Sequence, residues 1–266
     1  MKTALKRALG AALMLALVPV AAPAAAADRS TYPAIATGMA IPNGVAARTG
    51  IVPKAGRYVL IDAASARLFM MEGGTVRDSM KVIVGKPDAA TPALRSSLHY
   101  ATLNPYWNVP TDLAQTIIAP RVLADGTSYL RERGYQVVSE FGANGRVLPA
   151  ESVDWKAVAA GRKQVFVRQL PGPANSMGQI KFGLTNGNGI YLHDTPKKEL
   201  FAESERNLSN GCVRLEDANR FARWLLGDDA PLDASAPEQH VALPRAVPIV
   251  ITYLDQQAQM QLASLN

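Results

Sequence analysis

The chain has 266 residues, of which 48% are hydrophobic, 19% charged and 6% aromatic. This is the composition of an ordinary globular protein and excludes wholesale disorder, because enough apolar side chains are present to form a substantial core. A single cysteine excludes a disulfide framework and a multi-cysteine metal site, and three scattered histidines argue against a histidine-rich metal site. We therefore expect chemistry that uses no metal and no cofactor.

The first 27 residues have the pattern of a secretory signal peptide. Lys2, Lys6 and Arg7 precede an apolar stretch that ends at Val20, and a run of small residues with an Ala-x-Ala cleavage pattern ends at Ala27. The apolar stretch is shorter than the roughly 20 residues that span a bilayer, and no later segment could cross one. We therefore expect an exported protein without a transmembrane helix.

Cleavage at that point removes three basic residues and no acidic ones, which lowers the formal net charge from +6 to +3. The remaining basic residues form no stripe with interleaved aromatic residues, so nucleic-acid binding is not expected. Residues 28–55 are rich in Ala, Gly, Pro and Thr without periodicity, which predicts a linker or N-terminal arm.

From residue 56 the chain changes to short β-prone runs separated by Gly and Asp, which predict consecutive strands and hairpins. The expected strands lie at 58–61, 66–71, 76–84 and 98–103. Residues 111–165 then read as an insertion, with helices over 112–122 and 128–133 and a third helix capped by Ser152. Because long insertions in compact domains are commonly lids or binding elements, we expect a helical lid. A surface insertion without such a role is the alternative.

Strand patterns return at 165–170, 179–182 and 190–193, followed by a helix over 216–226 and a last strand over 247–253. This spacing predicts a mainly β fold, a sandwich or barrel with an inserted helical lid and a helix after Cys212, rather than an alternating parallel α/β fold. We expect one domain over 56–255 and a C-terminal tail over 256–266. No internal repeat is visible.

The lone thiol, Cys212, is the most informative residue. In an exported protein it cannot form an internal disulfide, and an idle exposed thiol would be open to oxidation. It is therefore either buried and inert or reactive. Its polar, glycine-containing surroundings, ahead of a helix expected from Glu216, would offer exposure, backbone N–H groups and a helix dipole that favours a thiolate.

Nucleophilic thiol catalysis also needs a base, and His193 ends an expected strand 19 positions before Cys212. An imidazole within hydrogen-bond reach of the sulfur can take its proton and pass it to a leaving amine. Alone, His193 would read as a structural histidine, but its pairing with an unpaired cysteine favours catalysis. His99 and His240 have no such partner, and we interpret both as structural or surface residues.

Two segments resemble the signature of the L,D-transpeptidases, whose catalytic domain is of the YkuD type. They are Tyr-Leu-His-Asp-Thr at 191–195 and Ser-Asn-Gly-Cys-Val-Arg at 209–214. Asn-Pro-Tyr-Trp-Asn-Val-Pro at 104–110 and Gly-Gln-Ile-Lys-Phe at 178–182, on either side of the insertion, resemble the lid-containing periplasmic YcbB-like branch. The resemblance covers about 56–253 and implies that the exported protein is periplasmic and associated with the cell wall.

The resemblance implies that Cys212 is the nucleophile, that His193 is the general base and acid, and that the backbone N–H groups of Gly211 and Cys212 bind the oxyanion. Many members have His-Gly-Cys where this chain has Asn-Gly-Cys at 210–212, which leaves His193 as the single candidate base. The candidate substrate-binding residues are Arg214, Tyr191, Asn186, Trp107 and Ser209.

Each of these contacts has a structural alternative. Arg214 could form a salt bridge, Tyr191 could pack on its strand, Trp107 could fill a core, and Ser209 is better explained as a turn-stabilising hydroxyl. Either the side chain of Asp194 or a backbone carbonyl could orient His193.

The implied partners are peptidoglycan stem peptides, a tetrapeptide donor and a diamino-acid acceptor, joined in a 3–3 crosslink through a thioester. The same site could serve an L,D-carboxypeptidase or an enzyme that attaches proteins to peptidoglycan, and a noncatalytic wall-binding relic is a further alternative. A papain-like peptidase is disfavoured, because there the cysteine precedes the histidine. Oligomeric state stays open.

Overall fold

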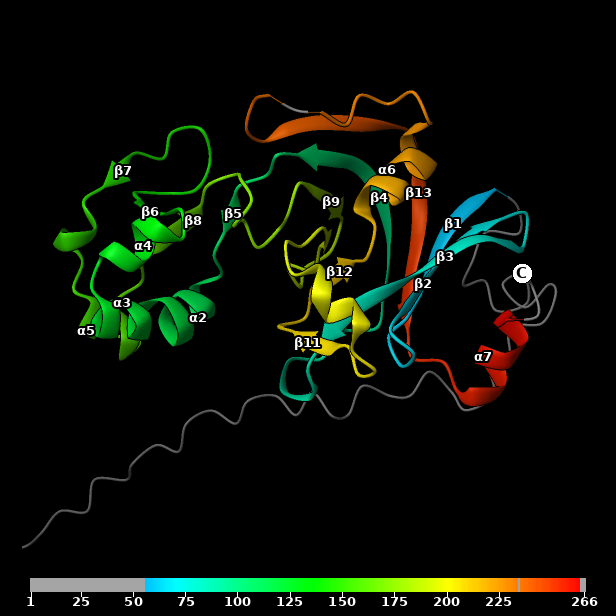
Figure 1. Cartoon of the computed structure of the whole chain (residues 1–266), viewed down its shortest axis with the longest axis horizontal. Coiled ribbons are helices and arrows are strands. Elements are labelled where there is room, and N and C mark those ends of the chain that lie inside the picture. Colours follow the sequence, from blue (N-terminus) through cyan, green and yellow to red (C-terminus); the bar gives the residue numbers. More distant parts are fainter. Residues whose placement is uncertain (1–55, 234, 264–266) are drawn as a thin grey trace, which may run out of the picture.

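The structure is a computed structural model that describes residues 56–233 and 235–263 (Figure 1). The expected signal peptide and N-terminal arm lie outside the described residues. Among the residues that are described, no helix is long and apolar enough to cross a membrane.

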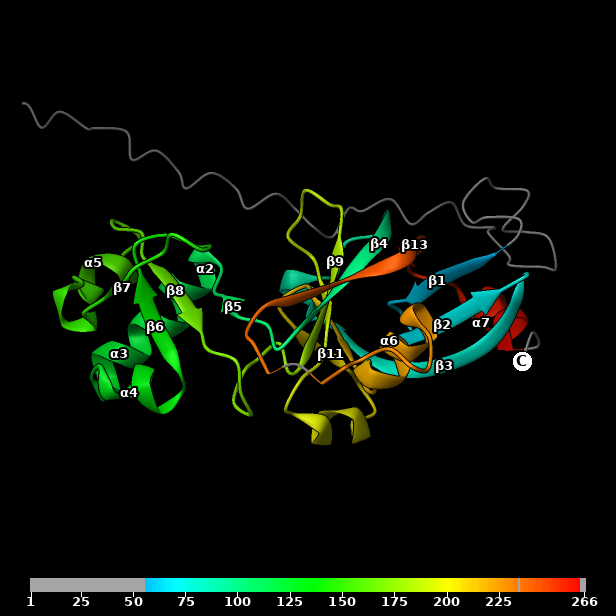
Figure 2. The ribbon, with the colours of Figure 1, turned by 90° about the horizontal axis from the view of Figure 1, so that it is seen from above.

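One large sheet forms the main body. Its strand order is β11-β3-β12-β10-β9-β4-β13-β1-β2. The strands are β1 (Arg57–Asp62), β2 (Arg67–Glu72), β3 (Thr75–Gly85), β4 (Leu94–Leu103), β9 (Ile180–Leu184), β10 (Leu192–His193), β11 (Asn207–Ser209), β12 (Val213–Leu215) and β13 (Gln239–Thr252). The long strand β3 also pairs with β2, so the two ends of the sheet meet and the sheet closes on itself (Figure 2). The expected mainly β fold is confirmed.

The period-two pattern of the strands explains the core. In β1, Val59 and Ile61 belong to the main hydrophobic cluster, whereas Tyr58 and Leu60 belong to a second cluster on the other face. Helix α6 (Ala218–Leu226) adds Phe221 to the main cluster, where it meets Phe182 edge-on with ring centroids 4.9 Å apart. This packing fixes β9 and α6, which border the strands of the signature.

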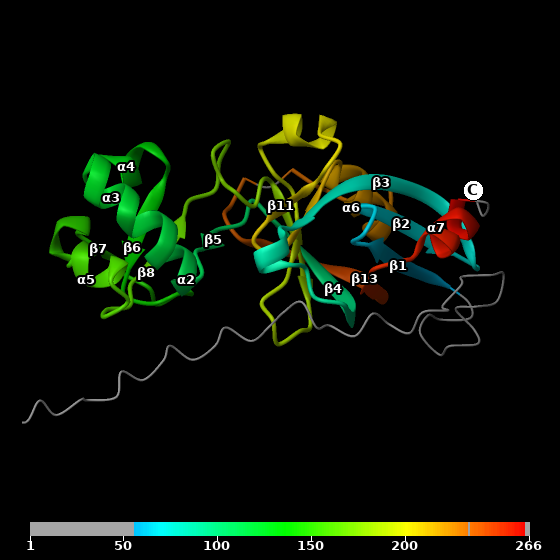
Figure 3. The ribbon, with the colours of Figure 1, turned by 90° about the horizontal axis from the view of Figure 1, so that it is seen from below.

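The C-terminal segment differs from the expected tail. Residues 256–263 form helix α7 (Gln256–Ala263), and its Leu262 is fully buried in the second cluster beside Leu60 and Val250 (Figure 3). This helix was not predicted, because among its described side chains the buried apolar ones are Ala258 and Leu262, too few to stand out as a helical period.

The insertion is a separate small unit with its own hydrophobic cluster, and it stands beside the main body in all three views (Figures 1, 2 and 3). It contains α2 (Thr111–Leu113), a π-helical turn η3 (Ala114–Ile118), α3 (Ala119–Asp125), α4 (Ser128–Glu132), β6 (Tyr135–Val138), β7 (Val147–Leu148), η4 (Ala150–Ser152) and α5 (Trp155–Ala159). With β5 (Trp107–Asn108) and β8 (Phe166–Gln169), the strands β6 and β7 form a four-stranded sheet of order β5-β8-β6-β7.

The insertion contains the expected helices, but the strands β6 and β7 were not predicted, because they are too short to give a readable alternation. The cap of the third helix was also misplaced. Asp154, not Ser152, caps α5, and its carboxylate accepts a hydrogen bond from the N–H of Ala157 at 2.9 Å. Ser152 lies in the preceding 3-10 turn η4, whereas η2 (Pro87–Ala89) and η5 (Lys198–Ala202) are 3-10 turns of the main body.

Candidate active site

Strand register gathers the signature residues on one face of the sheet. In β10, His193 pairs with Lys181 of β9 on one side and with Arg214 of β12 on the other. Paired residues point to the same face and alternate residues return to it, so Cys212 lies on the face of Arg214, and Tyr191 on that of His193. The burial pattern agrees, since Val213 and Leu215 are buried in the core while Cys212 and Arg214 are half-buried.

The environment of His193 fixes its tautomer. Its Nδ1 lies 2.5 Å from the backbone oxygen of Asp194. A carbonyl can only accept a hydrogen bond, so Nδ1 carries the proton and Nε2 keeps a free lone pair. Of the two groups considered for orienting His193, it is thus the backbone carbonyl, not the carboxylate, that receives its proton.

The imidazole of His193 is also neutral in the resting protein. The side chain is 4% exposed, and this burial, followed by the positive charge of Arg214, lowers the pKa of His193 to about 4. Lys181 lowers the pKa further, whereas the interactions with Asp194 raise it. At neutral pH His193 can therefore accept a proton through Nε2.

Cys212 is a neutral thiol in the same state. Burial raises the pKa of Cys212, and a hydrogen bond from the backbone of Tyr191 and the charge of Arg214 oppose that effect only in part. Its Sγ lies 3.9 Å from the backbone oxygen of Gly189. The expected helix dipole does not act here, because strand β12 follows Cys212 and α6 starts only at Ala218. The short strand was missed because Val213–Leu215 spans three residues.

The turn before Cys212 is braced from inside. Ser209 is buried, donates a hydrogen bond to the carbonyl of Cys212 at 2.6 Å and accepts one from the N–H of Gly211 at 3.1 Å. Gly211 has φ +114°, a conformation that L side chains rarely adopt. The buried hydroxyl of Thr91 holds the turn from the opposite side, donating to the carbonyl of Gly211 at 2.8 Å and accepting from the N–H of Gly85 at 2.9 Å.

Arg214 has no acidic partner among the described residues. It is half-buried, and burial lowers the pKa of its guanidinium, whereas the neighbouring Cys212 acts in the opposite direction. A cation that has lost part of its hydration without gaining a carboxylate is costly. The arrangement leaves this guanidinium available for an anionic group next to the thiol.

The other sequence-predicted contacts differ in position. Tyr191 is half-buried with the ammonium of Lys181 5.5 Å from its ring centroid. The amide of Asn186 is occupied, since it accepts from the N–H of Ile190 at 3.0 Å and donates to the carbonyl of the same residue at 2.9 Å. Asn186 therefore shapes the loop that carries Gly189. Trp107 packs on the hydrophobic cluster of the insertion, against Tyr135.

Sequence reasoning assigned no role to Lys181, Glu238 or Thr91. Lys181 forms an ion pair with Glu238 at 3.3 Å, and the other carboxylate oxygen of Glu238 accepts from the N–H of Tyr106 at 2.7 Å, at the start of the insertion. The only available signal for Lys181 was its place in the Gly-Gln-Ile-Lys-Phe segment. Nothing in the sequence pointed to Thr91, which lies 120 positions before Gly211.

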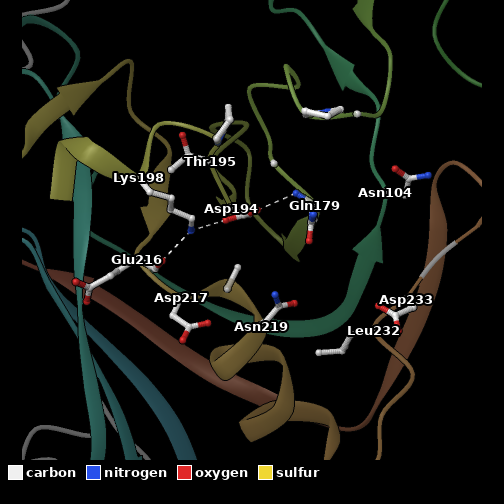
Figure 4. A pocket seen from close by; sticks show the side chains of 15 residues that line it. Asn104, Gln179, Asp194, Thr195, Lys198, Glu216, Asp217, Asn219, Leu232 and Asp233 are labelled. Atoms are coloured by element: carbon white, nitrogen blue, oxygen red, sulfur yellow. Dashed lines mark hydrogen bonds and ion pairs between the residues drawn. The ribbon is translucent and has the colours of Figure 1, made fainter.

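A cavity of about 580 Å³ lies at the carboxyl ends of β10 and β12, whereas Cys212 precedes the amino end of β12 (Figure 4). Asp194 and Glu216, the residues that follow the two strands, line it, and Cys212 does not. Lys198 and Gln179 converge there on the carboxylate of Asp194. The cavity therefore lies behind the residue that anchors His193, on the side away from the thiol.

Comparison with known proteins identifies the family. Residues 56–250 match the model of the YkuD family, described as the L,D-transpeptidase catalytic domain. Over 181 residues the chain is 32% identical to a Haemophilus influenzae protein that is assigned to the L,D-transpeptidases by name, a match that spans 68% of this chain and 36% of that protein. The chain thus matches about a third of the length of this relative.

Solved L,D-transpeptidase structures give weaker likenesses. An enzyme from Mycobacterium smegmatis matches with 16% identity and a TM-score of 0.35, covering 74% of this chain and 59% of that one. L,D-transpeptidase 3 from Mycobacterium tuberculosis, in complex with a faropenem-derived adduct, matches with 10% identity and a TM-score of 0.37, covering 74% and 60%. Scores of this size support no argument about this chain. On the family model and the Haemophilus influenzae relative, the chain belongs to the YkuD family of L,D-transpeptidase catalytic domains.

Proposed function

We propose that this protein forms 3–3 crosslinks between peptidoglycan stem peptides through a thioester on Cys212, with His193 as general base and acid. The observation that carries the proposal is the neutral imidazole of His193, which donates its Nδ1 proton to a backbone carbonyl. His193 pairs with Arg214 in the sheet, and so shares its face with Arg214 and Cys212.

In the first half-reaction, Nε2 of His193 takes the thiol proton of Cys212 as the sulfur attacks the amide carbonyl before the terminal D-alanine of a tetrapeptide. The resulting oxyanion collapses, the C–N bond breaks, and the proton passes from His193 to the departing amine of D-alanine. In the second, the amine of a neighbouring stem gives its proton to His193, attacks the thioester and displaces the sulfur, which recovers the proton.

The resting geometry supports specific roles for the neighbouring groups. The N–H of Gly211 is held by Ser209, so we propose that the N–H of Cys212 is the principal oxyanion donor and that Gly211 contributes after the turn adjusts. Arg214, without a carboxylate partner, is suited to a carboxylate of the donor stem. Tyr191, beside it on the same face, is suited to line the donor groove.

We further propose that the insertion, 111–165, limits water at the thioester and that the chain belongs to the lid-containing YcbB-like branch, exported to the periplasm. The support is the contact between Glu238 and both Tyr106, at the start of the insertion, and Lys181, on the face of the site. Exclusion of water would favour an amine over hydrolysis.

The test is incubation of the purified protein with disaccharide tetrapeptides, followed by mass spectrometry of the products and of the intact protein. We expect release of D-alanine, a covalent adduct on Cys212 and a crosslinked dimer with a 3–3 linkage. Cys212→Ala should abolish all three, whereas Lys197→Met, an exposed neighbour of the site, should leave them unchanged.

The products also separate the alternatives. Free tripeptide and D-alanine without any dimer would assign an L,D-carboxypeptidase, and attachment of an added protein amine in place of a stem would assign a protein-attaching enzyme. Absence of adduct and of D-alanine from the intact protein would contradict catalysis altogether and favour a wall-binding relic.

A further inference from the structure

Lys198 ties the segment that anchors His193 to the end of the strand that follows Cys212. Its ammonium donates to the carboxylate of Asp194 at 2.7 Å and to the carbonyl of Glu216 at 2.7 Å (Figure 4). It also donates to the carbonyl of Leu215 at 3.3 Å. Leu215 is the last residue of β12, and Asp194 directly follows β10. One side chain therefore joins the carboxyl ends of the two signature strands.

Asp194 is held from a second side by β9. Its other carboxylate oxygen accepts from the N–H of Gln179 at 2.9 Å, and its own N–H donates to the carbonyl of Ile180 at 2.8 Å. The carboxylate lies over Gly178, where an added Cβ would overlap it, and Gly178 has φ +62°. The peptide that receives the Nδ1 proton of His193 is thus immobilised by strands on both sides of β10.

The arrangement differs from an ordinary surface ion pair. An exposed ion pair contributes only about 0–1 kcal/mol to stability. Here the side chain of Asp194 is only 14% exposed, whereas that of Lys198 is 48% exposed, and two of the three acceptors are main-chain carbonyls at the end of β12, those of Leu215 and Glu216. These contacts fix the position of a backbone, which is what the imidazole requires.

We propose that Lys198 is a positioning residue for the general base, His193. By holding Asp194 at the end of β12, it keeps the Asp194 carbonyl hydrogen-bonded to Nδ1 of His193. Nε2 then stays unprotonated and ready to take the proton of Cys212. The proposal rests on the proposed function, because it assigns Lys198 a part in the same reaction. Lys198 touches neither the thiol nor the substrate in this role.

Replacing Lys198 by Met removes the three donated hydrogen bonds and keeps the length of the side chain, and the adjacent Lys197→Met is the matched control. Misplacement of a reacting group by about 1 Å can cost on the order of 100-fold. We expect Lys198→Met to lower kcat for D-alanine release about 10- to 100-fold with little change in KM, and Lys198→Arg, which can still donate to all three acceptors, to recover much of it. Lys197→Met should behave as wild type.

Two further readouts separate positioning from general destabilisation. Nitrogen chemical shifts of His193 should report the single Nδ1–H tautomer in the wild type and a mixture of tautomers in Lys198→Met. The charged groups facing His193 are Lys181 on β9, Arg214 on β12 and Asp194 beside it. Loss of the Lys198 charge leaves the Asp194 carboxylate uncompensated, which raises the pKa of His193, so the acid limb of kcat/KM should move to higher pH.

Wild-type kcat, tautomer and pH profile in a folded Lys198→Met variant would overturn the proposal. So would equal losses in Lys198→Met and Lys197→Met, or a loss in Lys198→Met that follows its thermal unfolding while the tautomer of His193 is unchanged. If instead the wild type releases no D-alanine and forms no adduct, the proposed function fails, which is a separate result from the response to Lys198.

Discussion

Replacement of Thr91 by Val tests whether the turn before Cys212 is held from a distance. Thr91 is fully buried, and its hydroxyl accepts from the N–H of Gly85 at 2.9 Å and donates to the carbonyl of Gly211 at 2.8 Å. Valine has a similar shape but no hydroxyl. The variant would leave one donor and one acceptor unsatisfied without opening a cavity.

Each orphaned buried group costs about 1–3 kcal/mol, so we expect Thr91→Val to lower the free energy of unfolding by about 2–6 kcal/mol. In a domain of this size about 1 kcal/mol lowers the Tm by roughly 2–4 °C, so a fall of at least about 4 °C should appear in thermal unfolding. Thr116→Val, on the exposed surface of the insertion, removes a single hydroxyl contact with Asp112 and should change stability by no more than about 0.5 kcal/mol.

The activity of Thr91→Val should fall more than its stability alone explains, because Gly211 would lose one of the contacts that fix the nucleophile turn. We expect D-alanine release, measured well below the Tm of the variant, to fall by about 10-fold or more. Unfolding and D-alanine release that both match the wild type would refute the reasoning, since they would show that the hydroxyl of Thr91 does not hold the turn.

Three other substitutions test the site. Gly211→Ala places a Cβ on a residue with φ +114°, 3.3 Å from Cδ1 of Ile190. We expect backbone strain to lower the free energy of unfolding by about 1–3 kcal/mol and to slow acylation. Wild-type thermal unfolding together with wild-type acylation would contradict the strain. Arg214→Met removes a charge that lowers the pKa of Cys212, so iodoacetamide labelling of the thiol should begin at higher pH, and an onset at lower pH would reverse the assignment. The pKa of His193 is lowered to about 4 in the folded protein from about 6.5 in the unfolded chain. The unfolded state therefore binds the proton first, and stability is lost as the pH falls from about 6.5 to 4, by roughly 3 kcal/mol. His193→Gln should reduce the change of the denaturant midpoint with pH over this range, and an unchanged slope would contradict it.

Most of the longer strands, and the candidate pair Cys212 and His193, could be identified from local patterns in the sequence. The strands β1 and β2 could be recognised from the β-prone runs at 58–61 and 66–71. Because side chains on both faces of these strands are buried, their sequences are nearly continuous hydrophobic stretches. Cys212 and His193 were found because a lone thiol and a strand-end imidazole are rare residue types in this chain.

The supports of the site could not be predicted, because they depend on strand order and register. Thr91 reaches Gly211 only because β3 and β12 are neighbours, and Lys181 faces His193 only because β9 pairs with β10 in this register. Lys198 adds its contacts at a strand end, where no sequence period applies. Short strands such as β12 carry too few residues for a pattern, and their absence from the prediction produced the mistaken helix dipole at Cys212.

The resting state of the site protects the half-buried thiol from oxidation, which the proposed export to the periplasm would require. Reactivity toward oxidants and alkylating agents follows the thiolate fraction, and burial raises the pKa of Cys212 while the nearby imidazole is neutral. In the proposed reaction the proton therefore moves to His193 only as the sulfur attacks a bound carbonyl. We expect iodoacetamide to label Cys212 more slowly than free cysteine at pH 7, as followed by intact-protein mass spectrometry. Labelling as fast as free cysteine, or faster, would mean that a thiolate is already formed in the free protein and that the neutral pair is not its ground state.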